Sequence, residues 1–354
     1  MNETSKYIPN EDGYLSEKDT KSYYSRIGMF CFLLGAISFA VSMAVSYVIV
    51  GFFPQILDNK QLLSIINYLL SFVAIYCIAT PIAFIALKPL PTANPNGGEM
   101  KIKHLIGALC ICFAGMEIGS YFSNIIITFT ESITGKTLVN PVESSLSTGN
   151  LMISALCVGI IFPILEELLF RKLLCGKLLP LGEKQAIIIS AAIFGLIHGN
   201  LFQFAYAFLL GLIFGYVYVK TGKIIYTIIF HCIINLYGGV FAQYVLSKIP
   251  LEKLEEILDW IVENPDSTSN IDLLLEKIGP YLGGLGLYML YAYVMMGLAF
   301  AGIIVFIVIA VKNQITFNQA QLKTTKPASN FFLNAGVATA LGFIVIRFLY
   351  SILA

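Results

Sequence analysis

Charged side chains are scarce in this sequence. Asp, Glu, Lys and Arg make up 12% of the 354 residues, and hydrophobic residues make up 57%. An ordinary soluble domain carries roughly 25% charged residues. The scarcity therefore excludes a typical soluble globular protein and indicates a chain that lies mostly in a membrane.

An excess of basic charge is also lacking. The formal net charge is +1, and there is no basic stripe of the kind that a nucleic acid partner requires. The seven cysteines all lie in or beside apolar runs, where they are expected to pack as small residues inside helices. These features exclude a nucleic-acid-binding protein and argue against a zinc knuckle or a redox pair.

Long apolar runs dominate the chain instead. A helix needs about 20 apolar residues to cross a bilayer, so we predict an all-α fold, a polytopic transmembrane helical bundle of about eight or nine transmembrane helices. We expect a cytoplasmic tail at 1–26 and a membrane domain at 27–354. The first run is too long for the core of a cleavable signal peptide. The runs are 27–54, 62–87, 104–129, 151–170, 185–199 (the short one), 201–219, 224–246, 281–311 and 329–353.

The distribution of Lys and Arg predicts the orientation of the bundle. With the N-terminus in the cytoplasm, sixteen of these residues fall in inner segments and five in outer segments, with Arg347 inside the last run. This bias follows the positive-inside rule. We expect an integral, multi-pass protein of the cell (plasma) membrane with an extracytoplasmic loop at 247–280. Within that loop, 251–262 has the apolar spacing of a short interfacial helix.

Polar side chains at membrane depth concentrate between 163 and 235. Glu166 and Glu167 are adjacent in one apolar run, near its inner end, and therefore point about 100° apart on a helix. Glu167 and Arg171 are spaced i, i+4 with the acid first, the favourable order for an ion pair. Glu166 has no such partner and is the free carboxylate. Alternatively, both glutamates extend toward the cytoplasmic headgroups beside Arg171.

Two of the three histidines lie in later apolar runs. Phe194 and His198 share one helical face at i, i+4, as do His231 and Asn235. Ionisable groups in a membrane are costly, so they normally face the bundle interior and mark a functional site. Glu166, His198, His231 and Asn235 are therefore the candidate site residues.

This set of side chains suits hydrolysis by water. A carboxylate shielded from bulk solvent is a competent general base for a water molecule. One imidazole can orient the water or protonate a leaving amine, and a second imidazole with an amide can stabilise an oxyanion. No nucleophile elbow or catalytic Cys/His context is present. Zinc remains possible, since Glu166, His198 and His231 form a plausible ligand set, although HExxH is absent.

The chain resembles the CAAX prenyl endopeptidases and bacteriocin-processing membrane proteases, the CPBP family. That family carries EExxxR, FxxxH and HxxxN on successive helices. Here the motifs run from Glu166 to Arg171, from Phe194 to His198 and from His231 to Asn235. A glycine-containing LLGLIFG stretch lies between the second and third motifs, and the resemblance covers about 150–240, the expected catalytic core.

The resemblance implies an intramembrane endopeptidase whose substrate is a peptide or protein near the membrane surface, prenylated for some family members. Glu166 and His198 would activate the attacking water, and His231 with Asn235 would form the oxyanion site. Glu167, Arg171 and Phe194 would be structural support. No cofactor is required on the metal-free interpretation that we prefer, while zinc stays possible.

The depths of the candidate residues conflict in a regular, level bundle. At 1.5 Å per residue, Glu166 and His231 lie roughly 10 Å from the inner face, and His198 lies roughly 20 Å in. We therefore predict that the short helix at 185–199 is tilted and stops within the membrane at Gly199-Asn200.

Two other classes of protein fit part of the pattern. An ion-coupled transporter also uses intramembrane Glu and His, but it favours internal repeats with paired broken helices, which are not visible here. A non-catalytic immunity or scaffold protein of the same fold is the second alternative.

Overall fold

The computed structural model describes residues 7–95, 97–141, 146, 150–249, 251–264 and 271–353. Regular structure in these residues is helical, and they form no strand beyond one isolated bridge between Tyr14 and Lys323. The prediction of an all-α bundle is confirmed.

Eight helices in the described part of the chain are long and apolar enough to cross a membrane. Several of these spans contain π-helical turns, which are frequent at functional sites. The spans are α1 (Glu17–Phe52), Lys60–Leu87, α5 (Ile102–Thr134), Leu151–Leu181, α11 (Leu201–Thr221), Ile224–Leu246, Leu275–Val311 and α18 (Ala335–Leu353).

The composite spans and the short helices have the following parts. The second span consists of α3 (Lys60–Ser71), η2 (Phe72–Ala79) and α4 (Thr80–Leu87). The fourth span, which carries Glu166, consists of α7 (Leu151–Leu156), η3 (Cys157–Ile161), α8 (Phe162–Glu167), η4 (Leu168–Cys175), α9 (Gly176–Leu178) and η5 (Leu179–Leu181). The sixth span consists of α12 (Ile224–Ile234), η6 (Asn235–Phe241) and α13 (Ala242–Leu246). Then come α15 (Ile271–Ile278), η8 (Gly279–Tyr281) and α16 (Leu282–Val311), with α2 (Gln55–Asp58), α10 (Glu183–Ile197), α14 (Leu251–Glu263) and α17 (Pro327–Phe332) as separate helices.

The short run at 185–199 forms α10, which has 15 residues and is too short for a regular span. It stops where the sequence predicts, because Gly199 adopts a left-handed φ of 64° that only glycine adopts without strain. Asn200 then caps α11, its side chain accepting a hydrogen bond from the backbone N–H of Gln203 at 3.0 Å.

Helices α10 and α11 pack closely along each other. A Cβ atom added at Gly211 would lie 2.9 Å from the Cα of Ala191, and one at Gly215 would lie 3.3 Å from the Ile187 side chain. Small residues at this spacing let two membrane helices approach. The glycines of the LLGLIFG stretch therefore serve helix packing.

The helix that carries Glu166 is longer than the sequence suggests. The expected run ends at 170, whereas the observed helix continues to Leu181. Glu166 consequently lies midway along the span, and the expectation that it lies near the inner end is wrong. The continuation escaped prediction because Arg171, Lys172 and Lys177 interrupt the apolar pattern. It also brings Glu166 to about the depth expected for His198.

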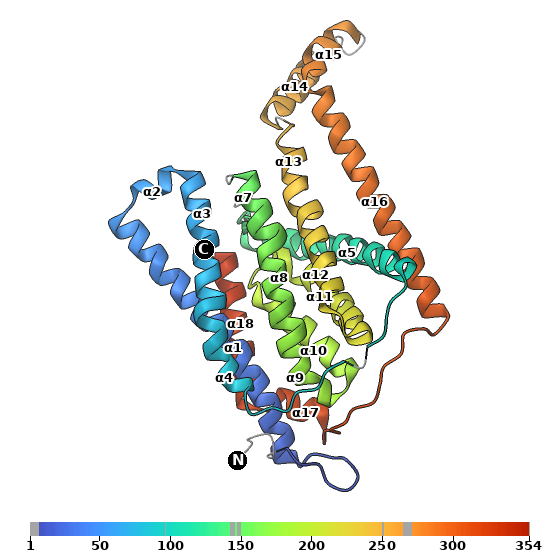
Figure 1. Cartoon of the computed structure of the whole chain (residues 1–354). Coiled ribbons are helices and arrows are strands. Elements are labelled where there is room, and N and C mark those ends of the chain that lie inside the picture. Colours follow the sequence, from blue (N-terminus) through green and yellow to red (C-terminus); the bar gives the residue numbers. More distant parts are fainter. Residues whose placement is uncertain are drawn as a thin grey trace.

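One end of the bundle is closed by connecting segments. The N-terminal segment, α9 and α17 lie together at the lower end of Figure 1. Ala93 donates a backbone hydrogen bond to Gly176 at 3.0 Å, and Leu322 donates one to Pro180 at 2.8 Å. We call this end the N-terminal face. The other end, where α1 and α13 finish and α7 begins, is the opposite face; α14 and α15 project beyond it (Figure 1). Helix α5 finishes on the same side, because Lys136, just beyond its end, donates a hydrogen bond to the backbone oxygen of Leu353 at the end of α18.

Cysteine labelling tests the orientation of these two faces. A cysteine placed in 92–98 or 314–325 is expected to react with an impermeant reagent only from the cytoplasmic side. One placed in 264–270 is expected to react only from outside, because sixteen of the Lys and Arg residues fall on the N-terminal side. Residues 96 and 265–270 lie outside the described part of the chain. Reversed labelling would overturn the orientation.

Candidate active site

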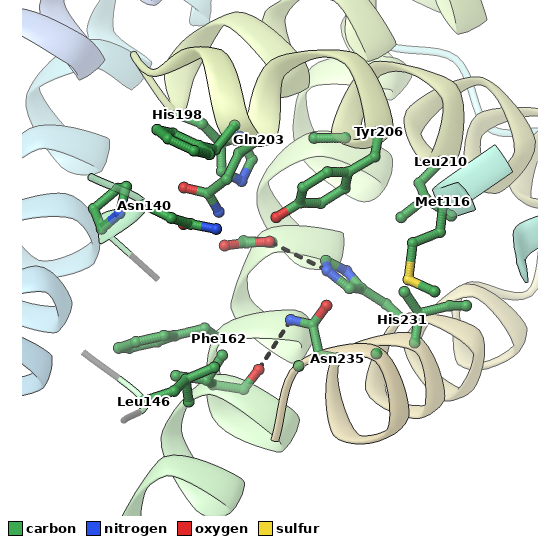
Figure 2. Close-up of a pocket in the computed structure, with 18 of the residues that line it drawn as sticks. Met116, Asn140, Leu146, Phe162, His198, Gln203, Tyr206, Leu210, His231 and Asn235 are labelled. Carbon is green, nitrogen blue, oxygen red and sulfur yellow. Dashed lines mark hydrogen bonds and ion pairs between the residues drawn. The ribbon is translucent and has the colours of Figure 1, made fainter. Parts of the chain in front are cut away.

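A cavity of about 700 Å³ lies between the helices and brings the candidate residues together. Glu166 comes from α8, His198 from the end of α10, His231 from α12 and Asn235 from the first residue of η6. Figure 2 shows His198, His231 and Asn235 around one space, with the carboxylate that contacts His231 between them. Phe194 lines the same cavity.

A continuous series of charged and polar contacts runs through the site. Arg171 Nε lies 3.2 Å from Glu167 Oε2, so the predicted ion pair is present, with both side chains fully buried. The other oxygen of Glu167 lies 3.1 Å from His231 Nδ1. His231 Nε2 lies 3.5 Å from Glu166 Oε2. The order of contact is therefore Arg171, Glu167, His231, Glu166.

The two glutamates differ in exposure. The side chain of Glu166 is 22% exposed and lines the cavity, whereas that of Glu167 is 0% exposed. Neighbours on a helix point in different directions, and here one direction leads to the cavity and the other to the core. Only Glu166 can contact a water molecule or a substrate in the cavity.

Aromatic rings enclose the buried half of this series. The guanidinium carbon of Arg171 lies 4.9 Å from the Phe194 ring centre and 5.7 Å from that of Phe214. Phe214 also packs against His231, with ring centres 5.2 Å apart. Cation–π contacts offset part of the cost of burying the guanidinium. The Nη atoms of Arg171 have no hydrogen-bond partner in the described part of the chain. The contacts that offset the burial of its charge are therefore those with Glu167 and the two rings.

The hydrogen bond of His198 fixes its tautomer. Its Nδ1 lies 2.7 Å from the backbone oxygen of Phe194. A carbonyl oxygen only accepts, so Nδ1 is the donor, and in the neutral ring Nε2 carries the lone pair. Phe194 therefore contacts His198 in two ways. Its carbonyl oxygen orients the imidazole, and its ring centre lies 5.3 Å from that of the imidazole.

The side chain of Asn235 makes a hydrogen bond that holds two helical segments together. Its side-chain N–H donates to the backbone oxygen of Val158 at 2.9 Å. In the π-helical turn η3 the Phe162 N–H bonds to Cys157, five residues back. The next such donor would be residue 163, but proline has no N–H. Val158 therefore keeps a free carbonyl, which Asn235 satisfies with one of its two amide N–H groups.

The sequence did not identify every polar residue near this site. Gln203 and Tyr206, in the first turns of α11, point into the same space as His198 (Figure 2). Both follow the Gly199-Asn200 stop at helical spacing, a signal that could have identified them. The contact of Glu167 with His231 was also missed, because 64 residues separate the two.

No group of three His, Cys, Asp or Glu side chains is arranged as a metal site among the residues that the structure describes. Glu166 and His231 lie together, whereas Nδ1 of His198 is engaged by its own helix. Its Nε2 is the nitrogen that could take part in chemistry in the cavity.

The fold and the cavity together define a multi-pass membrane protein with a carboxylate–imidazole site between its helices. The family described as type II CAAX prenyl endopeptidase Rce1-like matches residues 148–237, which contain all four candidate residues. Two curated proteins are similar. The membrane-embedded CAAX protease MroQ of Staphylococcus aureus (strain USA300) is 30% identical over 196 residues, covering 52% of this chain and 76% of that protein.

The second relative is the UPF0177 protein YxdF of Lactococcus lactis subsp. lactis (strain IL1403). It is 30% identical over 121 residues, covering 34% of this chain and 67% of that protein. No solved structure matches the chain significantly. This chain belongs to the Rce1-like CAAX protease (CPBP) family, as the three motifs predict, and membership implies a membrane endopeptidase.

Proposed function

We propose that this protein is an intramembrane endopeptidase that cleaves a peptide bond with a water molecule activated by Glu166 and His198. The observation that carries the proposal is the division of labour between the adjacent glutamates. One carboxylate is partly exposed in a cavity beside an imidazole, and the other is fully buried and holds that imidazole in place. The substrate is a peptide or protein segment close to the membrane.

In the proposed reaction, Glu166 removes a proton from water as the oxygen attacks the carbonyl carbon of the scissile bond. The carbonyl oxygen becomes an oxyanion, and the proton then passes to the leaving amine as the C–N bond breaks. Peptide and water become a carboxylic acid and an amine. The lone pair on Nε2 of His198 can accept a hydrogen bond from the water and orient it.

His231 and Asn235 are suited to stabilise the oxyanion. Nδ1–H of His231 is held by the Glu167 carboxylate, and in the imidazolium form Nε2–H also donates, into the cavity. The amide of Asn235 supplies a second donor. Donors held in place in a dry site are among the largest contributions to catalysis. The buried Glu167 carboxylate orients the His231 ring as the Asp carboxylate orients the His ring in a catalytic triad.

The proposed setting is the cell membrane, with the N-terminal face in the cytoplasm. An ion-coupled transporter needs a route to each face of the membrane in turn. The buried Arg171, Phe194 and Phe214 side chains lie against the candidate residues on the N-terminal side and favour a one-sided site over such a route. The same features are compatible with a scaffold, so activity has to be measured.

The purified chain in detergent is expected to hydrolyse a peptide library and to keep its rate after treatment with a metal chelator. The carboxylate and imidazole groups suffice to activate water, so metal removal should change the rate little. Loss of activity with release of about one zinc ion per chain would instead establish a zinc site. Failure to cleave any peptide, with Glu166-dependent movement of protons or solute in liposomes, would contradict the protease proposal.

A further inference from the structure

The cavity extends in one direction only. From Glu166, its wall follows the helices toward the opposite face. Asn67 lies seven residues after the start of α3 and Asn124 ten before the end of α5, and Leu246 is the last residue of α13. Each of these helix ends belongs to the opposite face. Asn67, Asn124 and Pro141 are exposed lining residues and form what we call the mouth.

The N-terminal side of the site is filled. Arg171, Phe170, Leu174 and Phe214 lie between the candidate residues and the N-terminal face, and each is 2% exposed or less. Below them, the Lys177 ammonium donates a hydrogen bond to the backbone oxygen of Leu90 at 2.6 Å. A fully buried layer and the connecting segments beyond it leave a substrate no route from this face.

The wall between the mouth and Glu166 is rich in side-chain amides. They are contributed by Asn67, Asn124, Asn140, Gln203 and Gln243. An amide both donates and accepts hydrogen bonds, which matches the N–H and C=O groups of a peptide backbone. No Lys, Arg or Asp lines the cavity in the part of the chain that the structure describes, and Glu166 is its one acidic side chain there. An acidic substrate side chain would therefore meet no Lys or Arg, and a basic one could pair only with Glu166, the proposed base.

We propose that the substrate reaches Glu166 from the extracytoplasmic side of the membrane, as an extended segment without charged side chains whose backbone binds the amide wall. The side follows from the mouth lying on the opposite face and from the excess of Lys and Arg on the N-terminal side. This inference rests on the proposed peptidase function for the identity of the occupant. The direction of entry rests on the position of the mouth and on the distribution of Lys and Arg.

Accessibility of the mouth can be measured without activity. Asn124→Cys is expected to react with a charged, impermeant maleimide added outside intact cells, well above the background of the unsubstituted chain. Lys88→Cys, exposed on the N-terminal face, should react only after permeabilisation. Ile125→Cys is the matched control. Ile125 follows Asn124 in the chain, and its side chain is 49% exposed but does not line the cavity. It should react slowly from both sides, as expected for a thiol facing lipid.

A cleavage assay tests the class of substrate. Among peptides that the purified chain hydrolyses, placing Asp or Lys beside the scissile bond should lower kcat/KM about tenfold or more. A buried Asp would meet no Lys or Arg, and a Lys would engage the Glu166 carboxylate that is needed as the base. Equal rates for charged and uncharged peptides would contradict the proposal that the substrate segment lacks charged side chains. Labelling of Asn124→Cys only after permeabilisation would overturn the direction of entry. External labelling without any peptide cleavage would instead contradict the proposed function and leave the direction of entry standing.

Discussion

Glu166→Gln is expected to abolish peptide cleavage while the protein stays folded in the membrane. Glutamine is nearly isosteric but cannot take a proton from water. A general base contributes about 10²–10⁴-fold to a rate, so activity should fall by at least that range. Glu166 is partly exposed in the cavity, and its carboxylate lies 3.5 Å from His231 Nε2. The change therefore removes little packing, and the yield of folded protein in detergent should match that of the parent.

Glu117→Gln is the matched control for this variant. Glu117 is another glutamate within a membrane helix, in the middle of α5, but it does not line the cavity. It should keep full activity. Asn235→Ala should retain a residual rate, since loss of one oxyanion donor costs about 10²–10³-fold, whereas His198→Ala should be as inactive as Glu166→Gln. An active Glu166→Gln would remove Glu166 from the role of base.

Glu167→Gln is expected to lower strongly the amount of folded protein in the membrane. Both partners of the Glu167–Arg171 ion pair are fully buried at 3.2 Å. Removing one charge strands the guanidinium between Phe194 and Phe214, and breaking a buried pair costs about 3–5 kcal/mol in the free energy of unfolding. The contact that orients His231 is weakened as well. The measurement is the folded fraction and the melting temperature in detergent, compared with Glu166→Gln.

A double substitution separates the ion pair from the other contacts of Glu167. Glu167→Gln with Arg171→Met leaves no buried charge, so stability should recover relative to either single change. Activity should stay low, because glutamine holds His231 less firmly than a carboxylate does. A stable but inactive Glu167→Gln together with an active Glu166→Gln would mean that the two glutamates have been assigned in the wrong order.

The motif spacings predicted the Glu167–Arg171 pair and the stop of α10 because both depend on local geometry. An acid and a base four residues apart are neighbours on the surface of a helix, and Gly or Asn just after an apolar run is a local signal for the end of a helix. The contact between Glu167 and His231 joins residues far apart in the chain, so no local pattern could predict it. The role of Asn235 toward Val158 required the π-helical turn before Pro163, which apolar periodicity does not reveal.

The sequence by itself determined that this protein is a helical membrane bundle whose polar residues gather between 163 and 235. An apolar run of about 20 residues matches the thickness of the bilayer, and a cluster of ionisable groups within such runs is costly and therefore indicates a functional site. Only the tertiary structure decided that Glu166 lies midway along a helix reaching Leu181, and that the cavity opens at the opposite face. Helix tilt, helix breaks and the packing of Arg171 against distant rings set that geometry, and these depend on contacts between segments that the order of residues does not display.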